Sequence, residues 1–448
     1  MTTVIYRDQQ SQRSPVFRRR HSSAAGAAAV DREQYAKLRL RIALFLENRV
    51  DTSGGYQQAL STIENLTRGR APLEFVVFTP FERSRLRLLE YGIEAIRYQH
   101  RPFNLLDRWS ATVLGNAVFR RLRRIGFRRL GRHLDALLDD YRIDVAFLND
   151  MGDVAWCIGD HPFIVAVWDL DHRDYPDLPE AYESRMFERR ERYMRITLTR
   201  ALAVIANSPS AARRITSLYQ VDSSRVLELP FLPALAVQRD AAGAGTMTVE
   251  GVRGKYGLPE QYVFYPATFL ASKNHLYLLE GLLTLERRRG IALHAVFSGG
   301  GDPRDRERVE RQVQALGLDE RVRFLGPVPD EDIPGLYRSA VALVMPTYCG
   351  PANLPPLEAV MLGCPVVYSD LPGCREQMGD SALYCDLGDP SSLADHLASL
   401  VQDPALRDRL LAAGRRRAAE IAQIDYGERL ARVLDDHAYL RRRWAWPE

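Results

Sequence analysis

Residues 346–367 read PTYCGPANLPPLEAVMLGCPVV, and this stretch carries the strongest local signal in the chain. Short apolar runs of strand length stand on both sides of an irregular, turn-rich loop. A helix is predicted to begin near Pro356, because proline fits the first turn of a helix, and Glu358 lies in that predicted turn. Gly363 ends the helix before the next strand. The stretch therefore predicts a strand–loop–helix–strand unit of a parallel sheet.

The same alternation of short apolar runs and helical stretches continues on both sides of this unit. In the N-terminal half the predicted strands are Leu40–Leu46, Glu74–Phe78, Ile93–Tyr98, Val145–Leu148, Phe163–Trp168 and Ala201–Ile205. In the C-terminal half they are Tyr262–Tyr265, Leu293–Ser298, Val322–Leu325, Val341–Met345 and Pro365–Tyr368. Residues 233–260 interrupt the pattern, and Ala241–Gly245 marks a loop between domains. We therefore predict an α/β fold with two Rossmann-like, doubly wound domains in series.

Composition agrees with a two-domain globular protein. The length of 448 residues suits two domains of similar size, and 46% of the residues are hydrophobic. No apolar run reaches the ~18–20 residues that a membrane span needs. The five cysteines show no metal-type pair spacing, and their odd number argues against a disulfide framework. We therefore expect a cytoplasmic protein.

The net charge of +4 comes from arginine-rich segments. Residues 1–30 carry five arginines against one aspartate, and we interpret residues 1–36 as a flexible basic tail. Between residues 101 and 132, nine arginines stand against Asp107 alone. Because no nucleic-acid module accompanies either segment, we expect an anionic surface or substrate and no nucleic acid as partner.

The segment 101–132 leaves two interpretations open. Val118, Phe119, Leu122 and Ile125 share one face of a predicted helix whose other faces are basic. Such a helix either makes a peripheral contact with an anionic membrane, where each arginine adds about 1 kcal/mol, or packs on the core with a solvated basic face.

Two further segments lie where a doubly wound domain binds ligands, beyond the carboxyl ends of its strands. Lys273 stands at the start of a predicted helix, where its charge and the helix end both favour phosphate, although a lone lysine there is often only a surface residue. Ser298–Gly301 contains three glycines, which allow close backbone approach to a ligand or simply a tight connection. The spacing is not GxGxxG, which argues against an NAD enzyme.

Together with Phe324–Pro329, these segments resemble the donor-binding signature of family 4 (group 1) glycosyltransferases of the GT-B fold, in a sub-pattern reading Gly-Pro-x-Asn-Leu-Pro-Pro-Leu-Glu-Ala. The resemblance covers roughly residues 255–415. It implies two Rossmann-like domains that face each other across a cleft. The implied parts are an N-terminal acceptor domain over residues 37–235, a C-terminal nucleotide-sugar donor domain over residues 236–424, and a helix over residues 425–448 that crosses back towards the N-terminal domain.

The resemblance also implies roles for single residues of the donor domain. Glu358 would accept hydrogen bonds from the ribose hydroxyls of the donor. Lys273 would neutralise the diphosphate, on which negative charge builds as it leaves. Backbone amides around Asn353 and Leu354 would hold the phosphate and the transferred sugar.

Four more residues complete the implied site. Gly326 and Val328 would line the nucleobase pocket. Gly55, the second of a glycine pair, would lie against the diphosphate from the other domain, although a bare glycine pair is more often an ordinary turn. His172, at the end of a Trp-Asp-Leu-Asp-His segment, would face the acceptor or the transferred sugar.

Asp169-Leu170-Asp171 imitates the Asp-x-Asp metal site of unrelated, metal-dependent glycosyltransferases. Two carboxylates alone make a poor cage for a divalent cation. The resemblance implies a mechanism without metal. We therefore predict no metal and no cofactor besides the nucleotide sugar that is the donor substrate.

The sequence departs from the family pattern in two places. Many members carry a second glutamate eight residues before the one that matches Glu358, and here that position is Gly350. Many also carry an arginine shortly before the lysine, where residues 267–269 read ATF. We hypothesise that Asn353 takes over part of the missing carboxylate's hydrogen bonding, and we place it with His172 and Glu358 among the candidate catalytic residues.

These observations predict a retaining, metal-independent hexosyltransferase. It would move a hexose from a nucleoside diphosphate sugar to a glycan or lipid-linked acceptor, in polysaccharide or glycolipid biosynthesis. Two alternatives stay open. One is a catalytically impaired partner subunit that still binds nucleotide sugar, which Gly350 makes conceivable. The other is a nucleotide-sugar epimerase, which would consume the donor without any acceptor.

Overall fold

The computed structural model describes residues 40–48, 54–69, 71–99, 133–152, 154–159, 161–182, 186–245, 247–350 and 352–444. All of them belong to one unit of the chain, Leu40–Glu448. The predicted tail over residues 1–36 and the arginine-rich stretch over residues 101–132 lie outside the described residues.

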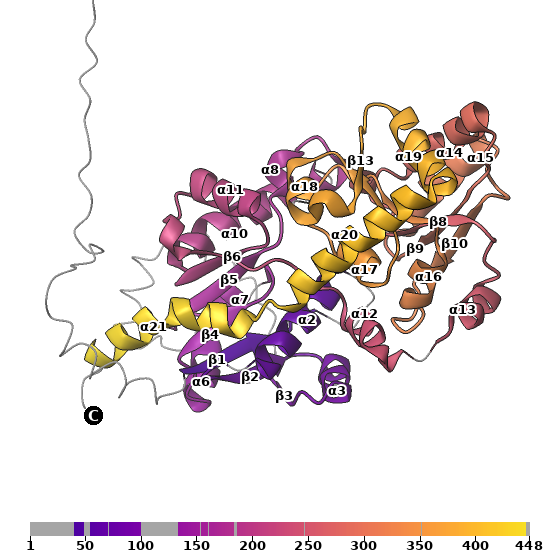
Figure 1. Ribbon diagram of the computed structural model, residues 1–448. Helices are drawn as coiled ribbons and strands as arrows, with labels where there is room; N and C mark the ends of the chain where they lie inside the picture. Colours follow the sequence, from indigo (N-terminus) through magenta and orange to yellow (C-terminus); the bar gives the residue numbers. More distant parts are fainter. Residues whose placement is uncertain are drawn as a thin grey trace, which may run out of the picture. The chain divides into compact units, whose positions relative to one another are not determined.

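The N-terminal half forms a seven-stranded parallel sheet in the order β3-β2-β1-β4-β5-β6-β7 (Figure 1). Its strands are β1 (Leu40–Phe45), β2 (Leu73–Thr79), β3 (Ala95–Arg97), β4 (Val145–Leu148), β5 (Phe163–Val167), β6 (Ala203–Ala206) and β7 (Val226–Glu228). β4 and β5 are apolar and buried at every position, as expected for central strands of a parallel sheet with both faces covered.

The C-terminal half forms a six-stranded parallel sheet in the order β10-β9-β8-β11-β12-β13. Its strands are β8 (Tyr262–Pro266), β9 (His294–Ser298), β10 (Val322–Gly326), β11 (Ala342–Met345), β12 (Val366–Ser369) and β13 (Leu383–Cys385). Counted from β8, this is the strand order 3-2-1-4-5-6 of a Rossmann fold, and the first six strands of the other sheet follow the same order. The predicted fold class, two Rossmann-like doubly wound domains, is confirmed.

Helices connect the strands of both sheets. In the N-terminal half they are α2 (Gly54–Arg68), α3 (Glu82–Glu90), α6 (His133–Asp140), α7 (Val154–Cys157), α8 (Asp171–Asp174), α9 (Pro179–Tyr182), α10 (Met186–Arg200), α11 (Pro209–Tyr219) and the short η2 (Ser223–Arg225). The helices that follow are α12 (Leu235–Arg239), η3 (Asp240–Ala244), α13 (Val249–Tyr256), η4 (Ala271–Lys273), α14 (His275–Arg289), α15 (Pro303–Ala315), α16 (Ile333–Ser339), α17 (Leu354–Met361), α18 (Pro372–Met378), η5 (Gly379–Ser381), α19 (Pro390–Gln402), α20 (Pro404–Ala422) and α21 (Tyr426–Trp444).

The segment between the sheets differs from the prediction. Residues 233–260 were expected to lack regular structure, but they contain α12, η3 and α13. α12 is anchored by Leu235 and Val237, and α13 by Val252, all of which are buried. One or two buried residues per short helix are too few to produce a visible helical period, so the sequence pattern predicts a loop here.

The C-terminal helix returns to the N-terminal half. Figure 1 shows α20 and α21, in yellow, leaving the second sheet and reaching α2, with which α21 is in contact. The backbone amide of Tyr426 donates to Asn65 Oδ1 at 3.0 Å, and the side-chain hydroxyl of Tyr426 donates to the Pro230 carbonyl. Leu430 and Leu434 are fully buried. The last helix therefore joins the two halves by packing and by hydrogen bonds.

Candidate functional site

A cavity of about 640 Å³ lies beyond the carboxyl ends of β8 and β9, a volume typical of small-molecule sites. Gly54 and Gln57 of α2 line it from the N-terminal half. The C-terminal half contributes Ala234, Ala236, Val237, Pro266, Ala267, Thr268, Ser298, Gly299, Gly300, Gly301, Pro327, Val328, Asp330, Ile333, Leu354, Pro355 and Glu358. The predicted residues Val328, Leu354 and Glu358 are therefore brought together.

The glycine turn after β9 is shaped by its backbone. Gly299 has φ +145°, and a Cβ atom there would lie 2.3 Å from the carbonyl oxygen of Ala267. Gly301 has φ +133°. Only glycine fits these two conformations without strain, and at Gly299 it also permits the close approach of the segment after β8. The turn consequently exposes backbone, rather than side chains, to the cavity.

Glu358 is a buried carboxylate at the wall of the cavity, with 7% of its surface exposed. Its Oε2 accepts from the Tyr337 hydroxyl at 2.8 Å, and its Oε1 accepts from the Ala234 amide at 3.3 Å. Burial raises the pKa of Glu358 above its ordinary value, although both hydrogen bonds oppose the shift. A carboxylate has about four acceptor positions, so ligand hydroxyls can still bind it.

The start of α17 corrects one prediction. The helix begins at Leu354 rather than near Pro356, with Asn353 as its N-cap residue. Prolines at the second and third helical positions are compatible with this start, because a first-turn N–H makes no intrahelical hydrogen bond. Glu358 is thus the fifth residue of the helix and not part of its first turn, so the helix dipole explains little of its presence. Gly363, with φ +73°, follows the end of the helix as predicted.

The loop before α17 holds Asn353 in a hydrogen-bonded position of its own. The Asn353 amide N–H donates to Gln377 Oε1 at 3.1 Å, and its side-chain amide donates to the Tyr368 hydroxyl at 2.6 Å. Asn353 is not among the residues that line the cavity, whereas Leu354 is. The backbone amide of Asn353 is thus engaged in this structure, and its predicted roles stay predictions.

Lys273 lies close to this loop but does not line the cavity. It ends the short helix η4, ahead of α14, and its carbonyl oxygen accepts from the Tyr265 hydroxyl at 2.8 Å. The preceding residue, Ser272, accepts from the Tyr348 amide at 2.9 Å. The backbone around Lys273 is thereby fixed against the loop that leads to α17.

His172 lies away from the cavity. It is 1% exposed, and its Nε2 is 3.4 Å from the Tyr219 hydroxyl and 3.5 Å from Glu191 Oε2. Burial lowers the pKa of His172, so the neutral ring is favoured. Its ring also meets Phe187 edge to face. The structure therefore places His172 among the helices of the N-terminal half, and a direct contact with substrate remains a prediction.

The two remaining predicted glycines, Gly55 and Gly326, are not among the residues that line the cavity. Gly55 is the second residue of α2, and a Cβ atom there would lie 2.8 Å from the ring of Trp168. Gly54, its neighbour, lines the cavity instead. The carbonyl of Gly326 accepts from the Gly299 amide at 2.9 Å and so supports the glycine turn.

Asp169 is engaged by an arginine. Its two oxygens accept from Arg190 at 2.5 and 2.8 Å. Burial alone raises the pKa of Asp169, but Arg190 outweighs it and the pKa is lowered. Among the described residues no group of three or more histidines, cysteines, aspartates and glutamates is arranged to hold a metal. Metal independence stays a prediction.

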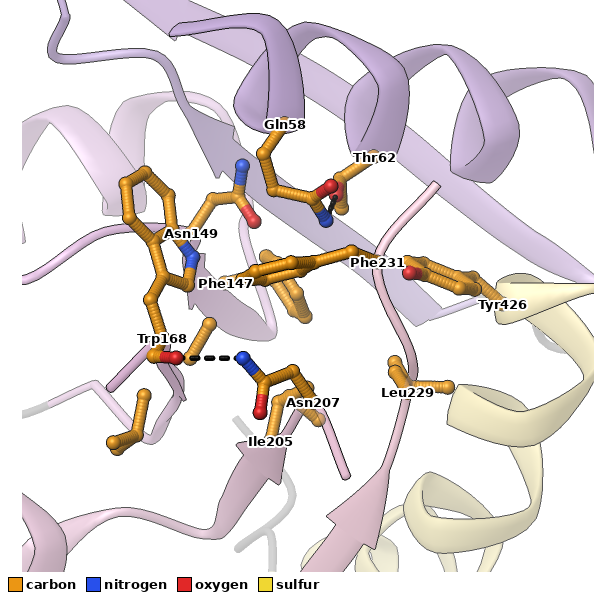
Figure 2. A pocket seen from close by; sticks show the side chains of 12 residues that line it. Gln58, Thr62, Phe147, Asn149, Trp168, Ile205, Asn207, Leu229, Phe231 and Tyr426 are labelled. Atoms are coloured by element: carbon orange, nitrogen blue, oxygen red, sulfur yellow. Dashed lines mark hydrogen bonds between the residues drawn. The ribbon is translucent and has the colours of Figure 1, made fainter. Parts of the chain in front are cut away.

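A second, much smaller cavity of about 10 Å³ lies at the carboxyl ends of β4, β5 and β6, with room for one water molecule (Figure 2). Asn149 and Asn207 are among its lining residues, together with Trp168. The Asn207 side chain donates to the Trp168 carbonyl at 2.6 Å. Asn149 Nδ2 and Asn207 Oδ1 are buried without a protein partner, which suits a bound water.

A polar bridge between the halves was not predicted from the sequence. The Gln57 side chain donates to both oxygens of Asp330, at 3.0 and 3.1 Å, and Arg87 forms an ion pair with Asp330 at 3.0 Å. Gln57 and Asp330 both line the large cavity. Neither Gln57 nor Asp330 belongs to a recognisable sequence motif, so the local sequence does not predict the contact between them.

The bridge is expected to contribute modestly to stability. A double-mutant cycle on Arg87→Ala and Asp330→Ala should give a coupling energy of about 0.5–1 kcal/mol in chemical unfolding, because the pair is partly buried. The side chains of the pair are only 29% and 18% exposed. The matched control is Arg416 and Asp380, a pair that is 64% and 80% exposed, whose coupling should be close to zero. Equal coupling in both cycles would contradict the prediction.

The comparisons with known proteins agree with this geometry. Residues 252–417 match the family model described as glycosyl transferases group 1. The chain is 29% identical over 248 residues to O-antigen chain mannosyltransferase B of Escherichia coli, which covers 54% of this chain and 63% of that protein. It spans about half the length of the next curated relatives that it matches.

Solved structures match along nearly the whole chain. A glycosyltransferase from Rickettsia africae superposes with a TM-score of 0.63 at 14% identity, over 91% of this chain and 100% of that one. HepE of Anabaena in complex with UDP-glucose superposes with a TM-score of 0.60 at 15% identity, over 91% and 100%. Among the described residues no helix is long and apolar enough to cross a membrane. Over residues 252–417 the sequence is therefore similar to group 1 glycosyltransferases, and along nearly its whole length the protein has the GT-B fold of solved glycosyltransferases.

Proposed function

We propose that the protein is a retaining, metal-independent hexosyltransferase that uses a nucleoside diphosphate sugar and acts on a glycan or lipid-linked acceptor. The observation that carries the proposal is the cavity of about 640 Å³ in which Glu358 and the glycine turn meet. Both lie within the segment that matches group 1 glycosyltransferases. The E. coli relative is named as an O-antigen chain mannosyltransferase, which supports a hexose donor and a role in polysaccharide biosynthesis.

The cavity offers complementary groups to the parts of such a donor. The carboxylate of Glu358 suits the ribose hydroxyls, which are hydrogen-bond donors. The helices α2 and α17 both begin at the cavity, at Gly54 and Leu354, and the positive ends of helices stabilise a diphosphate. Lys273 ends the short helix that follows β8 and does not line the cavity, but its positive charge would favour departure of the diphosphate. HepE, which shares the fold, was crystallised with UDP-glucose.

A thermal-shift panel tests the proposal. The panel contains UDP-, GDP-, ADP- and dTDP-glucose together with the four free diphosphates. A ligand at one hundred times its Kd adds about 2.7 kcal/mol to the free energy of unfolding, so at least one member should raise the melting temperature clearly. The best donor is then incubated with and without glycan or lipid-linked acceptors, and transfer is followed by mass spectrometry. The proposal is ruled out if no member of the panel raises the melting temperature. Turnover of the donor without any acceptor would favour an epimerase.

A further inference from the structure

Asp171 brings a carboxylate from the N-terminal half to the loop that leads to α17. It is the first residue of α8, which follows β5. Its Oδ1 accepts from the amide of Gly350 at 3.2 Å. Gly350 lies in the loop after β11, which is a strand of the C-terminal sheet. A side chain of one half therefore binds the backbone of the other at this point.

The backbone conformation at Gly350 disfavours any residue with a side chain. Its φ is +99°, and a Cβ atom there would lie 3.0 and 3.1 Å from the side-chain amide atoms of Asn353. Any other residue would be strained at this φ, and its Cβ atom would require Asn353 to shift by a few tenths of an ångström. A side chain at this position is therefore unfavourable in this loop, and Asp171 brings a carboxylate to the loop from the N-terminal half.

Asp171 and the neighbouring Asp169 differ in their positively charged partners. The neighbouring carboxylate, Asp169, is taken up by two hydrogen bonds from Arg190. Burial and the charge of Asp169 raise the pKa of Asp171 to about 6, while a hydrogen bond with the Cys349 thiol and the charges of Lys273 and Arg190 lower it. Lys273 thus lies close enough to Asp171 to influence its ionisation. Asp171 combines an ionisable carboxylate, a fixed position and a neighbouring cation.

We propose that Asp171 binds hydroxyl groups of the transferred sugar and thereby sets the hexose preference of the enzyme. This inference rests on the proposed function, in which Lys273 lies beside the donor diphosphate. A sugar attached to a diphosphate beside Lys273 would come near Asp171, because Lys273 lies close enough to influence the ionisation of Asp171, which is bound to the Gly350 amide. Sugar hydroxyls donate strong hydrogen bonds to carboxylates, and a carboxylate held in one position discriminates between axial and equatorial hydroxyls.

The test compares Asp171→Asn and Asp171→Ala with the wild-type protein. Dissociation constants are measured for UDP-, GDP-, ADP- and dTDP-glucose and for the matching free diphosphates. Asp171→Asn keeps an acceptor for the Gly350 amide, so the protein should fold and bind the free diphosphate within about twofold of wild type. Binding of the sugar nucleotide should weaken about tenfold, because a hydrogen bond to a charged group is lost. The preference among donors with glucose, galactose and mannose should narrow in both variants.

Glu376→Gln is the matched control. Glu376 also reaches across to a backbone amide of the other half, that of Ser210 at 2.9 Å, but its charged neighbour is Arg213. This variant should keep the wild-type ratio of sugar-nucleotide to diphosphate affinity. The same ratio should fall in the wild-type protein as the pH drops through about 6, where Asp171 gains its proton, and should stay flat in Asp171→Asn.

The outcomes separate the two proposals. A wild-type protein that binds none of these ligands overturns the proposed function and this inference with it. The role of Asp171 alone is overturned if the wild-type protein binds sugar nucleotides and Asp171→Asn changes neither the ratio of sugar-nucleotide to diphosphate affinity nor the hexose preference. Weakening of free diphosphate and sugar nucleotide by the same factor also overturns it, because that result shows a merely structural contact.

Discussion

Replacing Glu358 with alanine is expected to weaken binding of the nucleoside diphosphate on the order of ten- to a hundredfold, because a charge-assisted hydrogen bond is worth about 1.5–3 kcal/mol. The carboxylate lines the cavity from within α17 and is 7% exposed, so water replaces it poorly once it is removed. The dissociation constant of the best diphosphate from the thermal-shift panel, measured by calorimetry, checks the prediction. Glu358→Gln should fall between wild type and Glu358→Ala, since it keeps a neutral acceptor.

The control for Glu358 is Tyr337→Phe. This change removes the hydroxyl that donates to Glu358 Oε2 at 2.8 Å and leaves the carboxylate in place. Tyr337→Phe should lower the free energy of unfolding by about 1 kcal/mol and keep diphosphate binding within a few-fold of wild type. If Glu358 only held Tyr337 and the Ala234 amide, Glu358→Ala would cost stability without changing affinity, and the assignment to the ribose would be lost.

The pH dependence of the same binding follows from the raised pKa of Glu358. Burial favours the protonated carboxyl in the free protein, so protonation of this group stabilises the folded state, and the contribution is lost as the pH rises through the raised pKa. A ribose that donates its hydroxyl hydrogens needs the ionised form. Protonation of Glu358 and binding of the donor therefore compete. As the pH is lowered, the affinity for the diphosphate should begin to fall at a higher pH than it would with an ordinary glutamate. Glu358→Gln should lack this dependence.

The sequence predicted the strands best where they are fully buried. β4 was placed to the residue, because Val145–Leu148 is an apolar run with buried side chains at every position. β7 and β13 were missed because each has three residues, most of them only partly buried, which leave no period to read. The start of α17 was placed two residues late, since proline fits several positions of a first turn. Burial thus decided which elements were visible.

The candidate site was predictable where it is contiguous in the chain. Val328, Leu354 and Glu358 all line the cavity, and each was found within a motif. Gln57 and Asp330 were missed because they are separated by 273 positions and meet only when the halves assemble. His172 belongs to a motif that is recognisable in the sequence, but its side chain is buried beside Tyr219 and Glu191, so its contact with substrate stays a prediction. Contacts between distant segments follow from packing and leave no local pattern.

Gly299→Ala is expected to lower the free energy of unfolding by about 3 kcal/mol and to weaken diphosphate binding by more than tenfold. An added Cβ atom would lie 2.3 Å from the carbonyl oxygen of Ala267, and φ is +145°. The turn has little freedom to adjust, because the Gly299 amide donates to Gly326 at 2.9 Å and the Ala267 amide donates to Ser298 at 2.8 Å. Relief of the clash must break one of these bonds or move the turn into the cavity.

Gly300→Ala provides the matched control within the same turn. A Cβ atom at Gly300 would meet its nearest neighbour, Pro327 Cγ, at 3.7 Å, which is ordinary contact. This variant should unfold within about 1 kcal/mol of wild type and keep most of its affinity. Chemical unfolding and calorimetry on both variants give the comparison. The two substitutions add the same methyl group to adjacent residues, so a difference between them measures the strain and the close contact at Gly299. Equal behaviour would show that the turn relaxes and does not shape the cavity.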